Sequence, residues 1–544
     1  MPRFRTRDLS RVRLNRTVDT PEIAARDSAL ATGPDAPASP HPVGRLAGLN
    51  LVALVLERVL ALAILVIVAA TYGASTLTDA YFLALIVPLS LAVAAMDALY
   101  TTLLPHFSGE SAERRAAVLR AALRLTFLPL ALALGAYVLG VWLLVSEYQS
   151  IWLAFAPLLV AMPLSGIYAA LFLVERRYVV SIMRVPLASV ITLLLVLVAV
   201  WQDRSLLSFA LALSAGQLAI LLLLVLAARA GPAPARTEPG LRGRTLFGSA
   251  GSVFAASLVA GQLVIVAERF LASGLGERTV TWLVDARGFA LLPAILAQAL
   301  GAGVLPAAAE RHKAVDRQAL RSLALLALRL GLVIALVSIA FIVVCRRELI
   351  ELALERGKFT REDSVETASL VAVLAPAIAG LAASTIAGKA LLGVGLQRMV
   401  AAFSAAGLLL YVLSAVLLRE LGGATGLAAA FSLSATVTGV LFAVYLARQF
   451  ELAPRAVLQQ WLLIPLLYGG TFALGALVGW LLGRGLGDSG WAALGTVGLA
   501  ALGGGIALAS LLALTRGPER AYLLAGRRAL SRRVAPKSSR PAGE

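Results

Sequence analysis

Charged side chains set inside long apolar stretches are the residues of this chain that could do chemistry. Six of them form three close pairs: Glu57 and Arg58, Glu268 and Arg269, and Asp285 and Arg287. A charge near the middle of a membrane helix costs at least about 2.5–3.5 kcal/mol on insertion scales, so such a residue normally faces a cavity or a partner. We therefore take these six residues as candidates for a binding site inside a membrane protein.

Arg58 and Arg287 suit an anionic ligand. A guanidinium presents forked donors that match the oxygens of a phosphate or diphosphate. We predict that both arginines line a central cavity and bind a diphosphate there. The alternative is a structural ion pair with Glu57 or Asp285. Because adjacent residues on a helix point about 100° apart, Glu57 need not neutralise Arg58.

Two further carboxylates lie in the second apolar stretch, and each has two interpretations. Asp79 follows Thr78 where a helix begins, so it is a candidate substrate-binding residue or the N-cap of that helix. Asp97 is a candidate proton or cation site, or a buried carboxylate hydrogen-bonded to a neighbouring helix. For Arg184 and Lys389 we predict side chains that extend to the inner headgroups.

Metal and disulfide chemistry have little support in this sequence. Cys345 is the single cysteine, which excludes an internal disulfide, and the histidines, His41, His106 and His312, are widely scattered. We expect no metal, no cofactor and no catalytic group.

Membrane-spanning helices must position the charged residues, because the composition is far too apolar for a soluble chain of 544 residues. Hydrophobic residues make up 60% of the chain and charged residues 14%, and the mean hydropathy is +0.87. Crossing the hydrocarbon layer takes about 20 mostly apolar residues. Such runs predict an all-α integral membrane protein of about fourteen helices, near residues 46–73, 79–104, 124–146, 151–174, 178–201, 206–228, 244–272, 279–305, 318–345, 366–393, 396–418, 424–447, 458–483 and 491–515. Bends are predicted where prolines interrupt these helices, at Pro88, Pro163, Pro186, Pro293 and Pro376.

The formal net charge of +18 comes from basic residues that collect in the tails and in alternate loops. A nucleic-acid-binding protein would instead carry them on a face studded with aromatic residues. Basic loops of membrane proteins stay in the cytoplasm, so this alternation predicts a multi-pass protein with both termini cytoplasmic.

A segment rich in proline and glycine follows six predicted helices and predicts a design of two lobes. We divide the chain into a disordered basic cytoplasmic extension (1–45), an N-lobe of six helices (46–230), a cytoplasmic linker (231–243), a C-lobe of six helices (244–450), two further helices (451–516) and a basic cytoplasmic tail (517–544). Six is an even number, so both lobes insert with the same orientation. A central cavity is expected between them.

The connector after the ninth predicted helix, residues 346–366, contains both acidic and basic residues. Leu349, Ile350 and Leu352 alternate with acidic residues, a pattern typical of a short amphipathic helix on the outer membrane surface. Gly357 can end that helix. Thr360, with Asp363 three residues later, predicts a capping box for the next helix.

Three sequence motifs resemble a known family. Residues 355–363, ERGKFTRED, are similar to the ERGxFTxxD segment of the MurJ (MviN) lipid II flippase family of the MOP exporter superfamily, and residues 78–82, TDAYF, resemble the TDAFF start of its second helix. The stretch from Asp285 to Pro306 is similar to the family's eighth helix. The resemblance covers roughly residues 46–515, and it implies fourteen helices in two lobes around a central cavity.

The resemblance also implies that Arg58 and Arg287 stand at two of the family's cavity arginines. Ile64 replaces another arginine, and the family's LPNLLRR stretch reads VPLSLAV here, at residues 87–93. A less positive cavity is compatible with a different lipid-linked sugar as well as with lipid II.

The function implied by the resemblance is to move lipid II from the inner to the outer leaflet by alternating access, in the cytoplasmic (inner) membrane of a bacterium. The membrane potential or an ion gradient would drive it. Expected partners are the lipid-linked anionic glycan, membrane lipids and cell-wall synthesis proteins, and no nucleic acid. The alternatives are a flippase for another undecaprenyl-diphosphate-linked unit, a cation-coupled drug antiporter of the same superfamily, a membrane glycosyltransferase with Asp79 as base, and a non-transporting scaffold.

Overall fold

A computed structural model describes residues 42–108, 110–202, 205–229, 249–487 and 490–514. The predicted extension up to residue 41, the linker 231–243 and the tail 517–544 lie outside these ranges. Packing divides the chain into two units, Met1–Leu46 and Ala47–Glu544. Residues 42–46 of the first unit begin a helix, and the packing and sites described here belong to the second unit.

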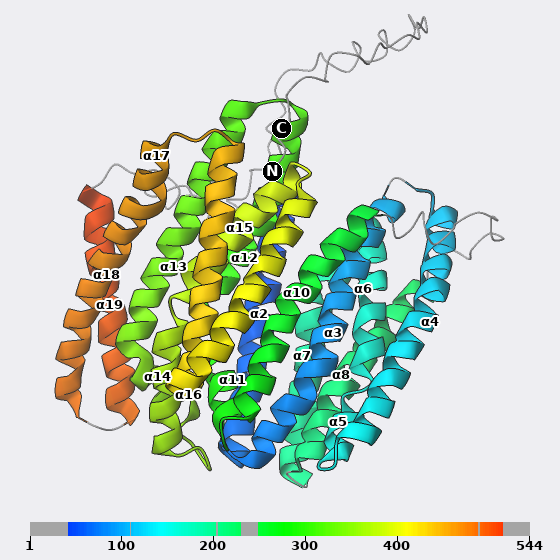
Figure 1. Cartoon of the computed structure of the whole chain (residues 1–544), viewed down its shortest axis with the longest axis horizontal. Helices are drawn as coiled ribbons and strands as arrows, with labels where there is room; N and C mark the ends of the chain where they lie inside the picture. The colour runs from blue at the N-terminus through cyan, green and yellow to red at the C-terminus, as the bar shows by residue number, and fades with distance from the viewer. Residues whose placement is uncertain (1–41, 109, 203–204, 230–248, 488–489, 515–544) are drawn as a thin grey trace, which may run out of the picture. The chain divides into compact units, whose positions relative to one another are not determined.

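The first half of the chain forms long helices joined by short turns (Figure 1). They are α2 (Pro42–Tyr72), α3 (Thr76–Phe107), α4 (Ala112–Leu144), α5 (Gln149–Ala154), α6 (Leu158–Val174), α7 (Tyr178–Gln202) and α8 (Leu206–Arg229).

The second half of the chain continues in the same way. Its helices are α10 (Ser249–Ser273), α11 (Thr279–Ala290), α12 (Ala294–Lys313), α13 (Arg317–Leu354), α14 (Arg361–Leu374), α15 (Ala377–Gly393), α16 (Gln397–Gln449), α17 (Pro454–Leu458), the π-helix η2 (Gln459–Leu463), α18 (Ile464–Gly483), the 3₁₀-helix η3 (Arg484–Leu486) and α19 (Gly490–Leu514).

The all-α membrane fold predicted from the sequence is confirmed. Within the described residues, ten helices are long and apolar enough to cross a membrane, or up to 12 if each bent pair counts as one span. Helix α16 is one of the ten, but its 53 residues are interrupted at Gly423, whose φ is +55°. A straight helix of that length would measure about 80 Å at 1.5 Å per residue. The hydroxyl of Ser434 donates to the carbonyl oxygen of Gly407 at 3.0 Å, so the two arms of α16 fold back on each other, as the predicted break between 418 and 424 requires.

Two of the five marked prolines stand at breaks, and three do not. Pro293 separates α11 from α12, which differ in direction by 55°, and Pro376 separates α14 from α15, which differ by 44°. Pro88, Pro163 and Pro186 lie inside α3, α6 and α7, which continue through them without a break. Proline removes one backbone donor, and surrounding packing can hold the helix together around it.

The connector after the ninth predicted helix differs from its prediction. Helix α13 runs without a break to Leu354, so the separate amphipathic helix on the outer surface is wrong, and Gly357 does not end it. Ile350 and Leu354 are fully buried in the protein core, and Glu348 accepts a hydrogen bond from the Trp480 indole at 2.7 Å. The apolar stripe therefore packs on protein rather than on lipid.

The starts of helices α14 and α4 can be compared with their predictions. The Thr360–Asp363 capping box is confirmed at the start of α14. Helix α4 begins at Ala112, well before the predicted residue 124, because its polar first turns are also helical, with Ser111 accepting a hydrogen bond from the Arg114 amide.

Small residues let the helices pack closely. A Cβ atom on Gly380 would lie 2.3 Å from the carbonyl oxygen of Ala435, and one on Gly439 would lie 2.5 Å from that of Gly380. Such small-residue contacts are typical of membrane helix interfaces. The main hydrophobic core draws on both halves of the chain, from Val68 and Phe82 to Leu283 and Ile378. The candidate site lies along this shared core.

Candidate functional site

Four of the predicted charged residues form a buried cluster between α10, α11 and α16. Glu268, Arg269 and Asp285 expose 1%, 4% and 1% of their surface. Glu268 pairs with the guanidinium of Arg287 and, at 3.4 Å, with that of Arg269. The guanidinium carbon of Arg287 also lies 4.0 Å from the centre of the Phe431 ring. Two acids and two arginines balance the formal charge of this cluster.

The ion pair considered for Arg287 forms with a different acid. The sequence suggested Asp285, whereas the structure pairs Arg287 with Glu268 of the preceding helix. Residues two apart on a helix point about 200° away from each other, so Asp285 and Arg287 face opposite sides of α11. The partner comes from another helix, where sequence spacing gives no guide.

Several polar atoms of this cluster have no hydrogen-bond partner among the described residues. They include both carboxylate oxygens of Asp285, Nε of Arg287 and the hydroxyl of Tyr411. Buried polar atoms in proteins are nearly always satisfied by protein or ordered water. The cluster therefore has unused capacity to bind polar groups.

On α2, the alternative considered for Arg58 is present, but it does not seal the arginine. Nε of Arg58 lies 3.2 Å from a carboxylate oxygen of Glu57, while the side chains expose 48% and 19% of their surface. An exposed pair of this kind contributes only about 0–1 kcal/mol. Arg58 can therefore exchange Glu57 for another anion at little cost.

The structure places Arg58 on the side of α2 that meets α11. A Cβ atom on Gly288 would lie 3.0 Å from Cδ2 of Leu65, so α2 and α11 touch at these residues. Leu65 follows Arg58 by two helical turns, about 10 Å along the axis, and points to the same side of α2. Gly288 directly follows Arg287. Arg58 thus lies on the side of α2 that carries this contact, and Arg287 neighbours the contact in the sequence.

Asp79 lies at what we call the outer end, following the predicted topology: the α2–α3 turn, the start of α11 and the connector 355–363. It is not the N-cap of its helix, since Ser75 caps α3 in a capping box with Thr78. Its Oδ1 instead accepts hydrogen bonds from the backbone amide of Thr281 at 2.8 Å and from the Thr281 hydroxyl at 2.5 Å. The carboxylate of the first half therefore caps helix α11 of the second half.

A glycine pair closes the outer end further. The Lys358 amide donates to the carbonyl oxygen of Ala70 at 3.0 Å, which joins the connector to the end of α2. Gly73 and Gly357 both adopt positive φ, +67° and +62°, and Cβ atoms there would lie 2.5 Å from the Lys358 oxygen and 2.1 Å from the Ala70 oxygen. Figure 1 shows the α2–α3 turn and the start of α11 at the same end of the bundle. Side chains at either glycine would force the two halves apart.

The connector is held to α11 within the second half. Asp363 accepts a hydrogen bond from the Trp282 indole at 3.0 Å and lies 3.7 Å from the Arg278 guanidinium. The ERGKFTRED motif thus supplies both the contact with α2 and the support for the start of α11.

Sequence reasoning missed a constellation toward the other end of the bundle. Asp97 of α3 lies within electrostatic range of Arg184 on α7 and Lys389 on α15. A guanidinium nitrogen of Arg184 lies 3.2 Å from the sulfur of Met96. The two cations therefore interact electrostatically with a carboxylate inside the bundle, which their separate positions in the sequence did not show. Three charged residues on separate apolar helices were the available signal, but nothing in their spacing links them.

Long apolar helices around a buried ion cluster define the class as a multi-pass membrane protein. A sequence model of the family described as "Lipid II flippase MurJ" matches residues 68–485. The match spans well over half of the chain, so the chain belongs to this family, as the sequence motifs predicted.

Solved structures show the same fold. The structure of "Lipid II flippase MurJ, inward closed conformation" superimposes with a TM-score of 0.69 at 16% identity, covering 84% of this chain and 97% of that one. An inward-facing multidrug resistance MATE family transporter of the MOP superfamily follows with a TM-score of 0.62 at 11% identity, covering 74% and 98%. None of the curated proteins compared with this sequence matches it.

Proposed function

We propose that this protein flips a lipid-linked anionic glycan precursor from the inner to the outer leaflet by alternating access. Peptidoglycan lipid II is the first candidate substrate, since the chain belongs to a lipid II flippase family. The observation that carries the proposal is the pairing of an outer end closed by Asp79 and Thr281 with a half-exposed Arg58 on the α2 side that meets α11.

The arginine pairs suggest how the headgroup is held and released. A diphosphate would replace Glu57 at Arg58 and Glu268 at Arg287, so each guanidinium exchanges one anion for another. Because the carboxylates take the arginines back afterwards, binding stays modest and release remains possible.

The second candidate substrate is another undecaprenyl-diphosphate-linked unit. Ile64, Ala92 and Val93 stand where the resemblance places further arginines, and Ile64 packs against the apolar core. Fewer cations favour a headgroup that carries less negative charge beyond its diphosphate.

The remaining parts of the proposal follow from the family and the charge pattern. The protein acts as a transporter rather than an enzyme, in the inner membrane of a bacterium with both termini in the cytoplasm. The membrane potential or an ion gradient drives the cycle, and cell-wall synthesis proteins are its proposed protein partners. A role for Asp79 as a catalytic base is disfavoured, because its carboxylate is occupied by Thr281.

The test is complementation in a bacterium depleted of its own lipid II flippase. Rescue by this chain, together with loss of rescue in Arg58→Ala and Arg287→Ala at unchanged membrane levels, is the expected result. Arg455→Ala is the matched control, since it is an exposed arginine on α17, away from both residues in the sequence. Full rescue by Arg58→Ala and Arg287→Ala would remove these arginines from the proposed site, and failure of rescue by the wild type would point to a different lipid-linked unit.

A further inference from the structure

A pocket at the opposite end of the bundle, the inner end, is not used by the flipping mechanism. It lies where α12, α13, α15 and α16 end or begin, and its volume is about 300 Å³. Its lining residues are His312, Arg317, Leu320, Arg321, Val394, Gln449, Phe450 and Glu451. Pockets of this size hold small ligands or headgroups.

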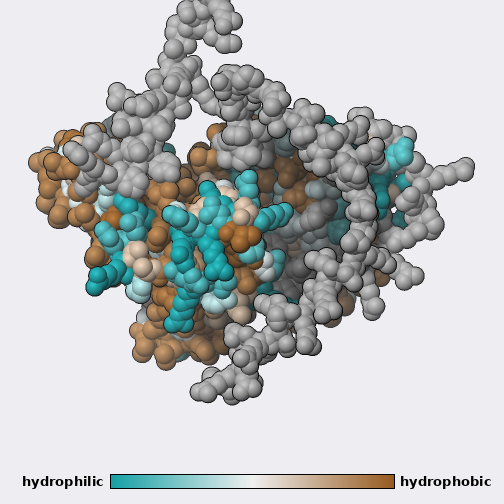
Figure 2. Space-filling view, turned by 90° about the horizontal axis from the view of Figure 1, so that it is seen from above, coloured by the Kyte–Doolittle hydropathy of each residue, from teal (hydrophilic) through white to brown (hydrophobic). Residues whose placement is uncertain are grey.

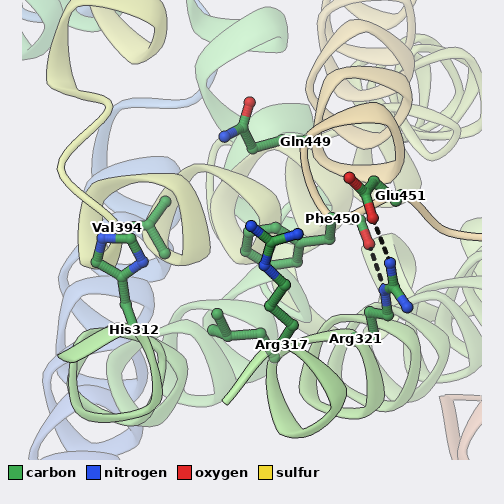
Figure 3. Close-up of a pocket in the computed structure, with 8 residues that line it drawn as sticks. His312, Arg317, Arg321, Val394, Gln449, Phe450 and Glu451 are labelled. Atoms are coloured by element: carbon green, nitrogen blue, oxygen red, sulfur yellow. Dashed lines mark hydrogen bonds and ion pairs between the residues drawn. The ribbon is translucent and has the colours of Figure 1, made fainter. Parts of the chain in front are cut away.

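The basic residues of the pocket differ in how they are engaged. Nε of Arg321 donates to the carbonyl oxygen of Phe450 at 2.9 Å, and its Nη2 pairs with Glu451 at 2.5 Å. That pair neutralises the only acid in the lining. Among the described residues, no hydrogen bond or ion pair engages the guanidinium of Arg317 or the imidazole of His312. Figure 3 shows Arg317 between His312 and Arg321, with its guanidinium in the pocket.

Local structure holds Arg317 in this position. Arg317 is the first residue of α13, and Asp316 caps the helix by accepting from the Ala319 amide at 2.9 Å. The turn before it places Val315 at φ +57°. The start of this 38-residue helix adds the partial positive charge of a helix N-terminus to the arginine. Charge, geometry and backbone dipole therefore all favour an anion.

The surroundings favour an anion attached to a lipid. Leu320 and Phe450 form an apolar floor and expose only 7% and 8% of their surface. The next helical segment, α17 with η2, turns Leu458, Leu462 and Leu463 outward. Figure 2, which views this end of the molecule, shows a hydrophilic patch beside hydrophobic helices. Basic pockets at the cytoplasmic ends of membrane helices bind phosphate-bearing headgroups.

We propose that this pocket binds the phosphate of an anionic phospholipid headgroup. Arg317 and His312 contact the phosphate, and Arg321 holds Phe450 and Glu451 in place at the side of the pocket. The acyl chains would lie along α17 and η2. Free phosphate shares the same chemistry, so the experiment has to separate the two sources. The site is remote from Arg58 and Arg287 in the sequence and does not depend on which glycan is flipped.

The experiment uses the purified full chain, freed of lipid in detergent and titrated with phosphatidylglycerol, phosphatidylcholine or inorganic phosphate. Native mass spectrometry counts the bound molecules. We expect phosphatidylglycerol to bind the wild type about tenfold more tightly than Arg317→Ala, since a charge-assisted hydrogen bond is lost at a partly exposed site. His312→Ala should give a smaller loss, and Arg347→Ala, an exposed arginine near the opposite end of α13, should bind as the wild type does.

The other outcomes are equally decisive. Inorganic phosphate that binds through Arg317 as tightly as phosphatidylglycerol would overturn the lipid assignment. Equal binding of phosphatidylglycerol by the wild type and Arg317→Ala would overturn the site itself. Hydrogen exchange at the α12–α13 turn gives a second measurement, because bound lipid should slow exchange there in the wild type but not in Arg317→Ala.

Discussion

The outer and inner ends of the helix bundle are held together in different ways. At the outer end, residues from the two halves of the chain bond directly, as Asp79 does with Thr281 and Lys358 with Ala70. Toward the inner end, Asp97 of the first half and Lys389 of the second half interact electrostatically, without a hydrogen bond or ion pair between them.

This difference shows which contacts must break before a substrate can leave toward the outside. The outer contacts are short, directional and specific, so they hold one state and must all break together. The inner charges interact over a longer distance, which tolerates movement of the helices. The described structure is therefore closed at the outer end.

The largest expected effect comes from Gly357→Ala. The positive φ costs a residue with a side chain about 1–2 kcal/mol, and the new Cβ would in addition lie 2.1 Å from the Ala70 oxygen. The outer end could then no longer close, so we expect loss of rescue in the complementation assay at normal membrane levels.

Gly395→Ala separates closure from backbone strain. Gly395 has a similar φ of +84° at an inner turn, but a Cβ atom there meets nothing within 4 Å. The Gly395→Ala variant should therefore have the backbone strain without a steric clash, and it should keep its activity. If Gly357→Ala and Gly395→Ala reduced rescue equally, closure of the outer end would not explain the glycine.

Asp79→Ala should give the next largest effect. It removes two hydrogen bonds to a charged acceptor, each worth about 1.5–3 kcal/mol, and should shift the population toward states open to the outside by about tenfold or more. Double electron–electron resonance between spin labels at the exposed outer residues Leu144 and Leu421 would report longer distances in the variant.

Asp316→Ala is the matched control for Asp79→Ala. Both carboxylates cap a helix N-terminus, but Asp316 caps its own helix α13, whereas Asp79 caps a helix of the other half. Loss of the Asp316 cap should lower stability by about 1 kcal/mol without changing the label distance. Unchanged distances in Asp79→Ala would show that the outer end does not depend on this contact.

Local features of the fold could be predicted from the sequence, whereas contacts between distant residues could not. The apolar stretches predicted the helices, and the Thr360–Asp363 capping box depended on residues three apart. The partner of Asp79 lies 202 residues away, and Glu348 meets Trp480 across 132 residues. An alternating pattern such as Glu348 to Leu354 is the same whether its apolar side packs on lipid or on protein.

The candidate site divides in the same way. The sequence identified Arg58, Arg287, Glu268 and Arg269 as intramembrane charges because each is unusual in its own helix. It could not assign the Arg287–Glu268 pair or bring Asp97 near Arg184, because these depend on how helices are placed around one another. The resemblance recognised the connector 355–363, but only the structure shows that it contacts the end of α2.

Asp97→Asn sharpens the comparison from the inner end and should have a smaller effect. It removes the negative charge that acts on Arg184 and Lys389, so the inner approach becomes more positive. Binding of an anionic lipid-linked substrate should strengthen by about two- to threefold at low salt and return to the wild-type value near 1 M salt, where the screening length is about 3 Å. Weaker binding at low salt would show that Asp97 orders the two cations instead of offsetting them.

The smallest effect is expected at the inner turn between α12 and α13, where Val315→Gly should stabilise the protein. Val315 has φ +57° and exposes 77% of its surface, so a β-branched side chain is strained there and little packing would be lost. Relief of about 1–2 kcal/mol is partly offset by the greater freedom of glycine in the unfolded chain, about 0.5–1 kcal/mol. The midpoint of thermal unfolding in detergent should therefore rise slightly, and Gly395→Ala should lower it. A lower midpoint of thermal unfolding in Val315→Gly would mean that contacts of the valine side chain stabilise the turn. The inner end would then depend on specific contacts, as the outer end does.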